Sequence, residues 1–247
     1  MVESAPQRVW VVGFGMGPEQ LTREASAALA DCDYVVAFRK AAHDPLLEVR
    51  RQICAEHGLR LVEVLDPERD RDDPVDYGGA VRQWHAQRTA ALLEVFEREQ
   101  GVAAFLVWGD PALYDSTLRL LDAAARVRPL DYQVVPGISA PQLLAARHRV
   151  VLHAVGQPVH ITTARRLRTA VEQGQRNICV MLGAEPDWSG LAHWHVWWGA
   201  NLGTASERLV AGVVGQVAGE IADARAQARA EAGWVMDSYL LRAPEAP

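Results

Sequence analysis

The sequence has a single lysine, Lys40, only three cysteines, and no long uninterrupted apolar run. Cys32, Cys54 and Cys179 are odd in number, far apart and form no C-x-x-C pair, which argues against a disulfide framework or a zinc site. No segment approaches the roughly 18 consecutive apolar residues that a membrane-spanning helix needs. The apolar run 9–12 is too short for a secretory signal, so we expect a cytoplasmic protein with no membrane partner.

Acidic residues outnumber basic ones, which gives the chain a formal net charge of −6. This balance argues against nonspecific nucleic-acid binding. His193 and His195 alternate along a strand-like segment, but no third metal ligand is evident, so we expect packing rather than a metal site. A chain of 247 residues can form one large domain or two of roughly 100–140 residues.

Strand-like and helix-like segments alternate through the first half of the chain. The predicted strands are 8–13, 34–38, 60–65, 102–107 and 132–135, and the predicted helices are 19–30, 46–57, 81–100 and 113–125. This alternation predicts a parallel or mostly parallel α/β sheet.

The second half has shorter predicted strands and fewer regular helices. The strand-like segments are 150–156, 159–163, 177–182, 195–198 and 235–241, and 207–230 is alanine-rich and mostly helical in pattern. The change indicates two α/β domains, one over 1–146 that carries the glycine turns described next and one over 147–247.

Three glycine-containing turns follow predicted strands, at 13–18, 109–111 and 136–139. Ligands of parallel α/β sheets bind at the carboxyl ends of the strands, so these turns are the first indication of a binding site. In the second turn, Pro111 can start the next helix and Asp110 can cap it, while Ser139 can cap the helix after the third. A capped helix without a ligand is the alternative interpretation.

The first turn is not a standard nucleotide fingerprint. The G-x-G-x-x-G pattern requires glycine at position 18, where this chain has proline, and no acidic residue ends the second strand. Instead Arg39 and Lys40 follow that strand, and a basic pair suits the extra phosphate of NADP. An NADP-dependent oxidoreductase therefore stays open as an alternative, whereas the sequence contains no P-loop.

Taken together, the turns VGFGMGPEQLT (12–22), GDPALYDST (109–117) and VPGISA (135–140) resemble the three motifs of the tetrapyrrole (corrin/porphyrin) methylases. The likeness extends over about residues 8–243. One departure is that the first motif is a residue short, with Met16 where the family usually has Pro or Ala and with no Asp after Gly17. The departure puts a carboxylate role in this turn in doubt and leaves the steric role of the glycines unchanged.

The resemblance implies two α/β domains of this family's type with the ligand cleft between them. It implies S-adenosylmethionine as methyl donor, a precorrin-type tetrapyrrole as substrate, and a homodimer. Segments 76–88, 152–163 and 201–208 are most similar to family members that methylate C-1 of precorrin-5 and release a two-carbon unit as acetate.

The resemblance also implies site residues. The donor would contact the three turns and parts of the second domain, namely Gly15, Met16, Gly17, Gly109, Asp110, Pro111, Tyr114, Ser139, Ala140, Met181, Leu182 and Leu202. Displacement at a sulfonium methyl needs alignment more than acid–base help, which agrees with a site built from backbone turns.

The substrate carries many carboxylates, so arginines are expected around it, and the candidates are Arg39, Arg88, Arg165 and Arg166. Acetate release needs water to attack a carbonyl, and hence a general base or an oxyanion donor. The candidates for these catalytic roles are Asp110, Tyr114, His85 and His153. Besides the oxidoreductase, two alternatives remain: another ring position or precorrin within the family, and a tetrapyrrole-binding protein without catalysis.

Overall fold

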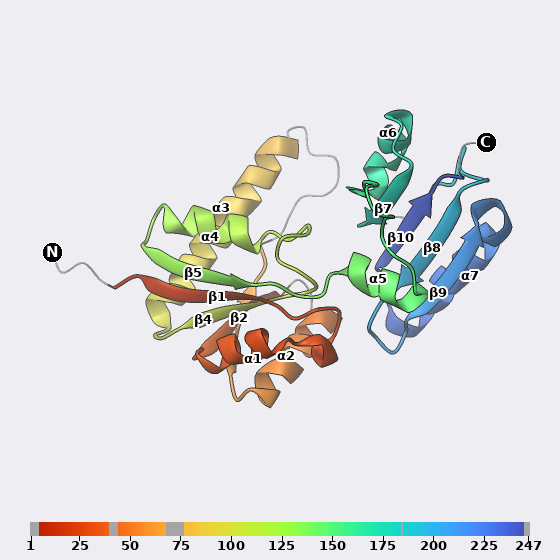
Figure 1. Cartoon of the computed structure of the whole chain (residues 1–247). Helices are drawn as coiled ribbons and strands as arrows, with labels where there is room; N and C mark the ends of the chain where they lie inside the picture. The colour runs from red at the N-terminus through yellow and green to blue at the C-terminus, as the bar shows by residue number, and fades with distance from the viewer. Residues whose placement is uncertain (1–4, 40–43, 68–76, 184, 245–247) are drawn as a thin grey trace. The chain divides into compact units, whose positions relative to one another are not determined.

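Figure 1 shows the computed structural model of the chain, which describes residues 5–39, 44–67, 77–183 and 185–244. The chain divides into two compact units, Met1–Ile138 and Ser139–Pro247. Within the described ranges, no helix is both long enough and apolar enough to cross a membrane.

The first unit is built on a five-stranded sheet with the order β3-β2-β4-β1-β5. Its strands are β1 (Gln7–Gly13), β2 (Tyr34–Arg39), β3 (Arg60–Leu65), β4 (Ala103–Val107) and β5 (Leu130–Val135). Every neighbouring pair is parallel, so the parallel α/β sheet predicted from the alternation is confirmed. All carboxyl ends therefore lie on one edge of this sheet.

Helices cover both faces of this sheet, with α1 and α2 on one side and α3 and α4 on the other (Figure 1). Their bounds are α1 (Arg23–Ala30), α2 (Pro45–Glu56), α3 (Tyr77–Arg98) and α4 (Thr117–Ala125), and a short 3-10 helix, η1 (Pro18–Gln20), precedes α1. Because both faces are covered, all five residues of β4 are buried, as is usual for a central parallel strand.

The second unit has a mixed sheet with the order β6-β7-β10-β8-β9. Its elements are α5 (Ala140–His148), β6 (His160–Thr163), η2 (Ala164–Arg166), α6 (Leu167–Glu172), β7 (Asn177–Met181), β8 (His195–Ala200), β9 (Arg208–Val213), α7 (Val214–Ala232) and β10 (Asp237–Arg242). Only β6 and β7 pair in parallel, and the other neighbours are antiparallel.

Two predictions for the second half were wrong. Residues 150–156 form no strand, and Val151 and Val155 are 65% and 102% exposed, so their β-branched side chains contribute little to a core. Residues 207–230 are mostly helical as predicted, in α7, but the prediction was wrong for 208–213, where the sequence RLVAGV forms β9 and pairs with β8.

Candidate active site

The first and second glycine turns meet at the carboxyl edge of the first sheet. Gly15 and Gly109 form an antiparallel bridge, in which Gly109 N donates to Gly15 O at 2.8 Å and Gly15 N donates to Gly109 O at 3.3 Å. Both glycines have φ of +73°, a left-handed conformation that glycine adopts without strain. Two segments 94 residues apart thereby become a single backbone surface.

The Asp110 side chain connects the second turn to the third. Its Oδ1 accepts a hydrogen bond from Ala112 N at 2.8 Å and its Oδ2 accepts one from Gly137 N at 2.9 Å. The predicted capping role was wrong, because α4 begins at Thr117 and Pro111 lies in a turn instead of at the first helical position. Asp110 therefore holds the second and third turns together, and its catalytic role stays a prediction.

Gly13 and Gly137 allow these turns to touch. A Cβ atom on Gly137 would lie 2.1 Å from Gly109 O and 2.8 Å from Gly13 C, and one on Gly13 would lie 2.6 Å from Gly137 N. Because these neighbours are backbone atoms, no side-chain rotation can relieve such contacts. Only glycine fits at both positions.

Met16 and Gly17 continue the first turn toward η1. The side chain of Met16 is 6% exposed, and its backbone N donates to Gln20 Oε1 at 3.0 Å. This bond supports the turn in a place where the family motif is a residue short. The sequence analysis missed Gln20, because nothing in the pattern distinguishes it from a helix-surface glutamine.

Strained backbone marks two of the expected donor contacts. Tyr114 and Leu182 have φ of +54° and +52°, and their side chains are 46% and 58% exposed. Asn201, directly before Leu202, has φ of +48°. Bulky residues seldom adopt this conformation, and it concentrates at ligand sites. The strained backbone is independent support for the prediction that these segments contact a ligand.

The second-unit candidates lie around strand ends and the start of α5. Met181 is the last residue of β7, and Leu202 is 2% exposed after β8. Asn201 is fixed by Met236, whose backbone N donates to Asn201 Oδ1 at 2.9 Å. Ser139 occupies the predicted N-cap position of α5, which Ala140 begins.

Two of the candidate substrate arginines belong to the first unit and are paired. Arg39 Nε lies 3.3 Å from Glu63 Oε2 at a partly exposed position. Arg88 Nε lies 3.0 Å from Asp66 Oδ1, with only 11% of the arginine side chain exposed. The rings of Phe38 and Trp84 lie 4.2 and 4.7 Å from the Arg88 guanidinium. These contacts fix the direction of Arg88, and burial lowers its pKa.

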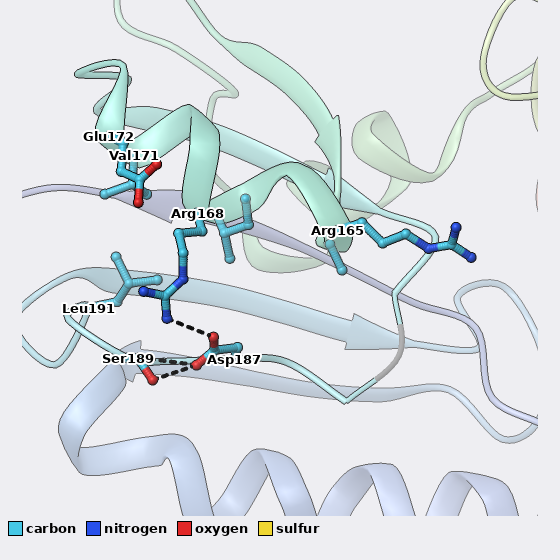
Figure 2. A pocket seen from close by; sticks show the side chains of 9 residues that line it. Arg165, Arg168, Val171, Glu172, Asp187, Ser189 and Leu191 are labelled. Carbon is cyan, nitrogen blue, oxygen red and sulfur yellow. Dashed lines mark hydrogen bonds and ion pairs between the residues drawn. The ribbon is translucent and has the colours of Figure 1, made fainter.

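Arg165 and Arg166 are exposed residues of η2 in the second unit. Arg165 borders a cavity of about 340 Å³, but its guanidinium points away from the Arg168–Asp187 pair (Figure 2). Hydrogen bonds from Ser189, then from Arg168, lower the pKa of Asp187 to about 2. Three of the polar residues that line this cavity, Arg168, Asp187 and Ser189, therefore bond to one another.

The two candidate histidines occupy different units. His85 lies on α3, where its ring packs edge-on against Trp84 with centroids 4.8 Å apart. His153 is exposed in the irregular segment before β6, and its Nδ1 lies 3.1 Å from Ala154 O. Their catalytic roles stay predictions. The described residues hold no cluster of three or more His, Cys, Asp or Glu arranged for a metal ion.

The carboxyl ends of β2 and β4 border a second, more polar cavity of about 180 Å³. Asp44 and Arg50 reach it from α2, and Asp115 and Ser116 reach it from the segment that leads into α4. Sequence reasoning missed Arg50 and Asp115, since charged residues on an amphipathic helix and before a helix are usually solvated.

Comparisons with known proteins agree with this arrangement. Residues 8–218 match the family model described as Tetrapyrrole (Corrin/Porphyrin) Methylases. The chain is 41% identical to precorrin-6A synthase [deacetylating] from Sinorhizobium sp, across 98% of this chain and 97% of that protein.

Solved structures show the same fold. A cobalamin synthesis related protein (CobF) from Corynebacterium diphtheriae has a TM-score of 0.84 and 36% identity, covering 98% of this chain and 100% of that one. Uroporphyrin-III C-methyl transferase from Thermus thermophilus, complexed with S-adenosylhomocysteine, has a TM-score of 0.59 and 19% identity, covering 95% and 92% of the two chains. At that identity the second likeness concerns the fold alone.

Proposed function

The chain belongs to the tetrapyrrole (corrin/porphyrin) methylase family, and from this premise we propose that it methylates precorrin-5 at C-1 and releases acetate, giving precorrin-6A. The observation that carries the proposal is the 41% identity to a deacetylating precorrin-6A synthase over nearly the full length of both chains. S-adenosylmethionine is the methyl donor, and bound to the protein it supplies a methyl group activated by its sulfonium.

The first unit fits this donor. The joined turns at Gly15, Gly109 and Gly137 present backbone without side chains at the carboxyl edge, where ligands of parallel sheets bind. The exposed, strained Tyr114 borders the same turns. Here the chain positions the methionine part of the donor and holds it in line with the acceptor carbon, which is the main requirement of a displacement.

In the second unit, the donor contacts that we propose are Ser139 and Ala140 at the start of α5, Met181 and Leu182 at the end of β7, and Leu202. The left-handed φ of Leu182 supports a ligand role for this segment. Arg39, Arg88, Arg165 and Arg166 remain the proposed contacts of the substrate carboxylates. The family resemblance also favours a homodimer, which a mass measurement in solution checks. We propose in addition that the protein acts in the cytoplasm.

Incubation of the purified protein with S-adenosylmethionine and precorrin-5 tests the proposed reaction. We expect a corrinoid whose C-1 carries a methyl group in place of the acetyl group, together with free acetate. If precorrin-5 is unchanged while another precorrin is methylated, the enzyme acts at another ring position or substrate of the family. Turnover that requires NADPH and not S-adenosylmethionine would instead identify an oxidoreductase.

A further inference from the structure

The cavity at the ends of β2 and β4 lies where the chain reverses its direction of winding across the sheet. β2 and β4 are neighbours although β3 and α3 separate them in sequence, and α2 and α4 leave their ends on opposite faces. Such switch points are the usual binding crevices of open α/β sheets. The cavity measures about 180 Å³, which is room for a two-carbon unit and a water molecule of about 30 Å³.

Arg50 reaches this cavity with unused hydrogen-bond donors. Its Nε donates to Leu106 O at 2.9 Å, and no group in the described part of the chain accepts from its two terminal nitrogens. Burial lowers the pKa of Arg50, while the nearby carboxylates of Asp44 and Asp115 oppose that shift. The guanidinium is thus held by one bond, partly desolvated, and able to donate to an oxygen in the cavity.

Asp115 supplies a carboxylate in the same cavity. Its Oδ1 accepts a hydrogen bond from Thr117 N at 2.6 Å, which fixes the side chain before α4. Its Oδ2 has no hydrogen-bond partner among the described residues. The Asp44 Oδ1 accepts from both Leu46 N and Leu47 N, which makes this residue the N-cap of α2.

Chain continuity and a backbone hydrogen bond connect the lining of the cavity to the glycine turns. Asp115 directly follows the turn 109–114, and Val107, which lines the cavity, accepts a hydrogen bond from Phe14 N at 3.0 Å. The Arg50 guanidinium also lies 5.9 Å from the centre of the Phe14 ring. A substrate held for methylation at the turns therefore has this cavity beside it.

We propose that this cavity is where the acetyl group is hydrolysed, with Asp115 as general base and Arg50 as the donor to the acetyl oxygen. Asp115 takes a proton from water as the water oxygen bonds to the acetyl carbonyl carbon, and Arg50 stabilises the resulting oxyanion. The carbon–carbon bond to the ring then breaks, and acetic acid leaves as acetate after losing a proton. The electron pair stays on the ring and balances the methyl cation that the ring accepts.

The proposal rests on the proposed function, and the Asp115→Asn variant tests it separately. Asparagine keeps the oxygen that accepts from Thr117 N, so the turn is retained while the base is lost. We expect acetate release from precorrin-5 under saturating conditions to fall at least about 100-fold, with S-adenosylhomocysteine affinity unchanged by calorimetry. Asp122→Asn, on the exposed surface of α4, is the matched control and should keep wild-type rates.

Arg50 is tested by the pair Arg50→Lys and Arg50→Met. We expect kcat for acetate release to fall in both variants and more in Arg50→Met, because lysine keeps a charged donor. If Asp115→Asn keeps the wild-type kcat for acetate release, Asp115 is not the general base and the proposal is wrong. If wild-type protein forms neither acetate nor methylated corrinoid, the proposed function itself fails.

Discussion

Gly137→Ala is expected to lower the free energy of unfolding by on the order of 3 kcal/mol and to weaken S-adenosylhomocysteine binding more than about tenfold. The new Cβ would lie 2.1 Å from Gly109 O, so the second and third turns must separate. Their separation would also break the hydrogen bond from Gly137 N to Asp110 Oδ2. Urea unfolding measures the first effect and calorimetry the second.

Gly219→Ala is the matched control for this substitution. Gly219 lies within α7, and a Cβ placed there meets nothing within 4 Å. Alanine in a helix interior should then stabilise by roughly 0.5–1 kcal/mol through helix propensity, with donor binding unchanged. Wild-type stability and affinity in Gly137→Ala would mean that contact between the turns is not required for the site.

Arg225→Met is expected to lower the free energy of unfolding by about 3–5 kcal/mol at neutral pH. Arg225 Nε lies 3.0 Å from Asp237 Oδ2, and the Asp237 side chain is completely buried. Trp198 Nε1 donates to the same oxygen at 3.3 Å. Methionine preserves much of the packing but leaves a buried carboxylate without its counter-charge. Urea unfolding of the variant and wild type at the same pH measures the difference.

The effect of this substitution should depend on pH. Burial raises the pKa of Asp237, and Arg225 opposes that increase, so its loss raises the pKa further. Because the pKa of Asp237 is raised in the folded protein, the folded state binds this proton more tightly than the unfolded chain does. The protonated carboxyl therefore contributes to stability, and this contribution is lost as pH rises through the raised pKa. The destabilisation of Arg225→Met should therefore be largest above the raised pKa and shrink as pH falls toward the ordinary value of about 3.9.

An exposed ion pair provides the comparison. Arg168 and Asp187 are 67% and 64% exposed, so Arg168→Met should change stability by no more than about 1 kcal/mol. If Arg225→Met is equally mild at neutral pH, the Asp237 carboxyl is already protonated in the wild type. The account of this pair would then be wrong.

The sequence was informative where local pattern and topology agree. Apolar β-branched runs such as β1 and β2 predict central strands, and the parallel order places the ends of these strands on one edge. The glycine turns at Gly13, Gly109 and Gly137 were therefore expected near one another, and their hydrogen bonds show that they touch.

Features that depend on distant partners could not be predicted. The Asp110 carboxylate accepts from Gly137 N, 27 residues away, which no capping rule anticipates. The placement of Arg50, on α2, depends on the carbonyl of Leu106 in β4, 56 residues away in sequence. Residues 150–156 have strand propensity but pair with no strand of the described sheets, and propensity alone does not form a sheet.

The central claim is that one active site couples methylation to acetate release. Its most direct test is to incubate precorrin-5 with S-adenosylmethionine carrying a labelled methyl group and to count labelled corrinoid and acetate in the same reaction. The account predicts one acetate for each labelled methyl group, at every time point after the first turnover. Labelled corrinoid without acetate, or acetate without labelled corrinoid, would contradict it.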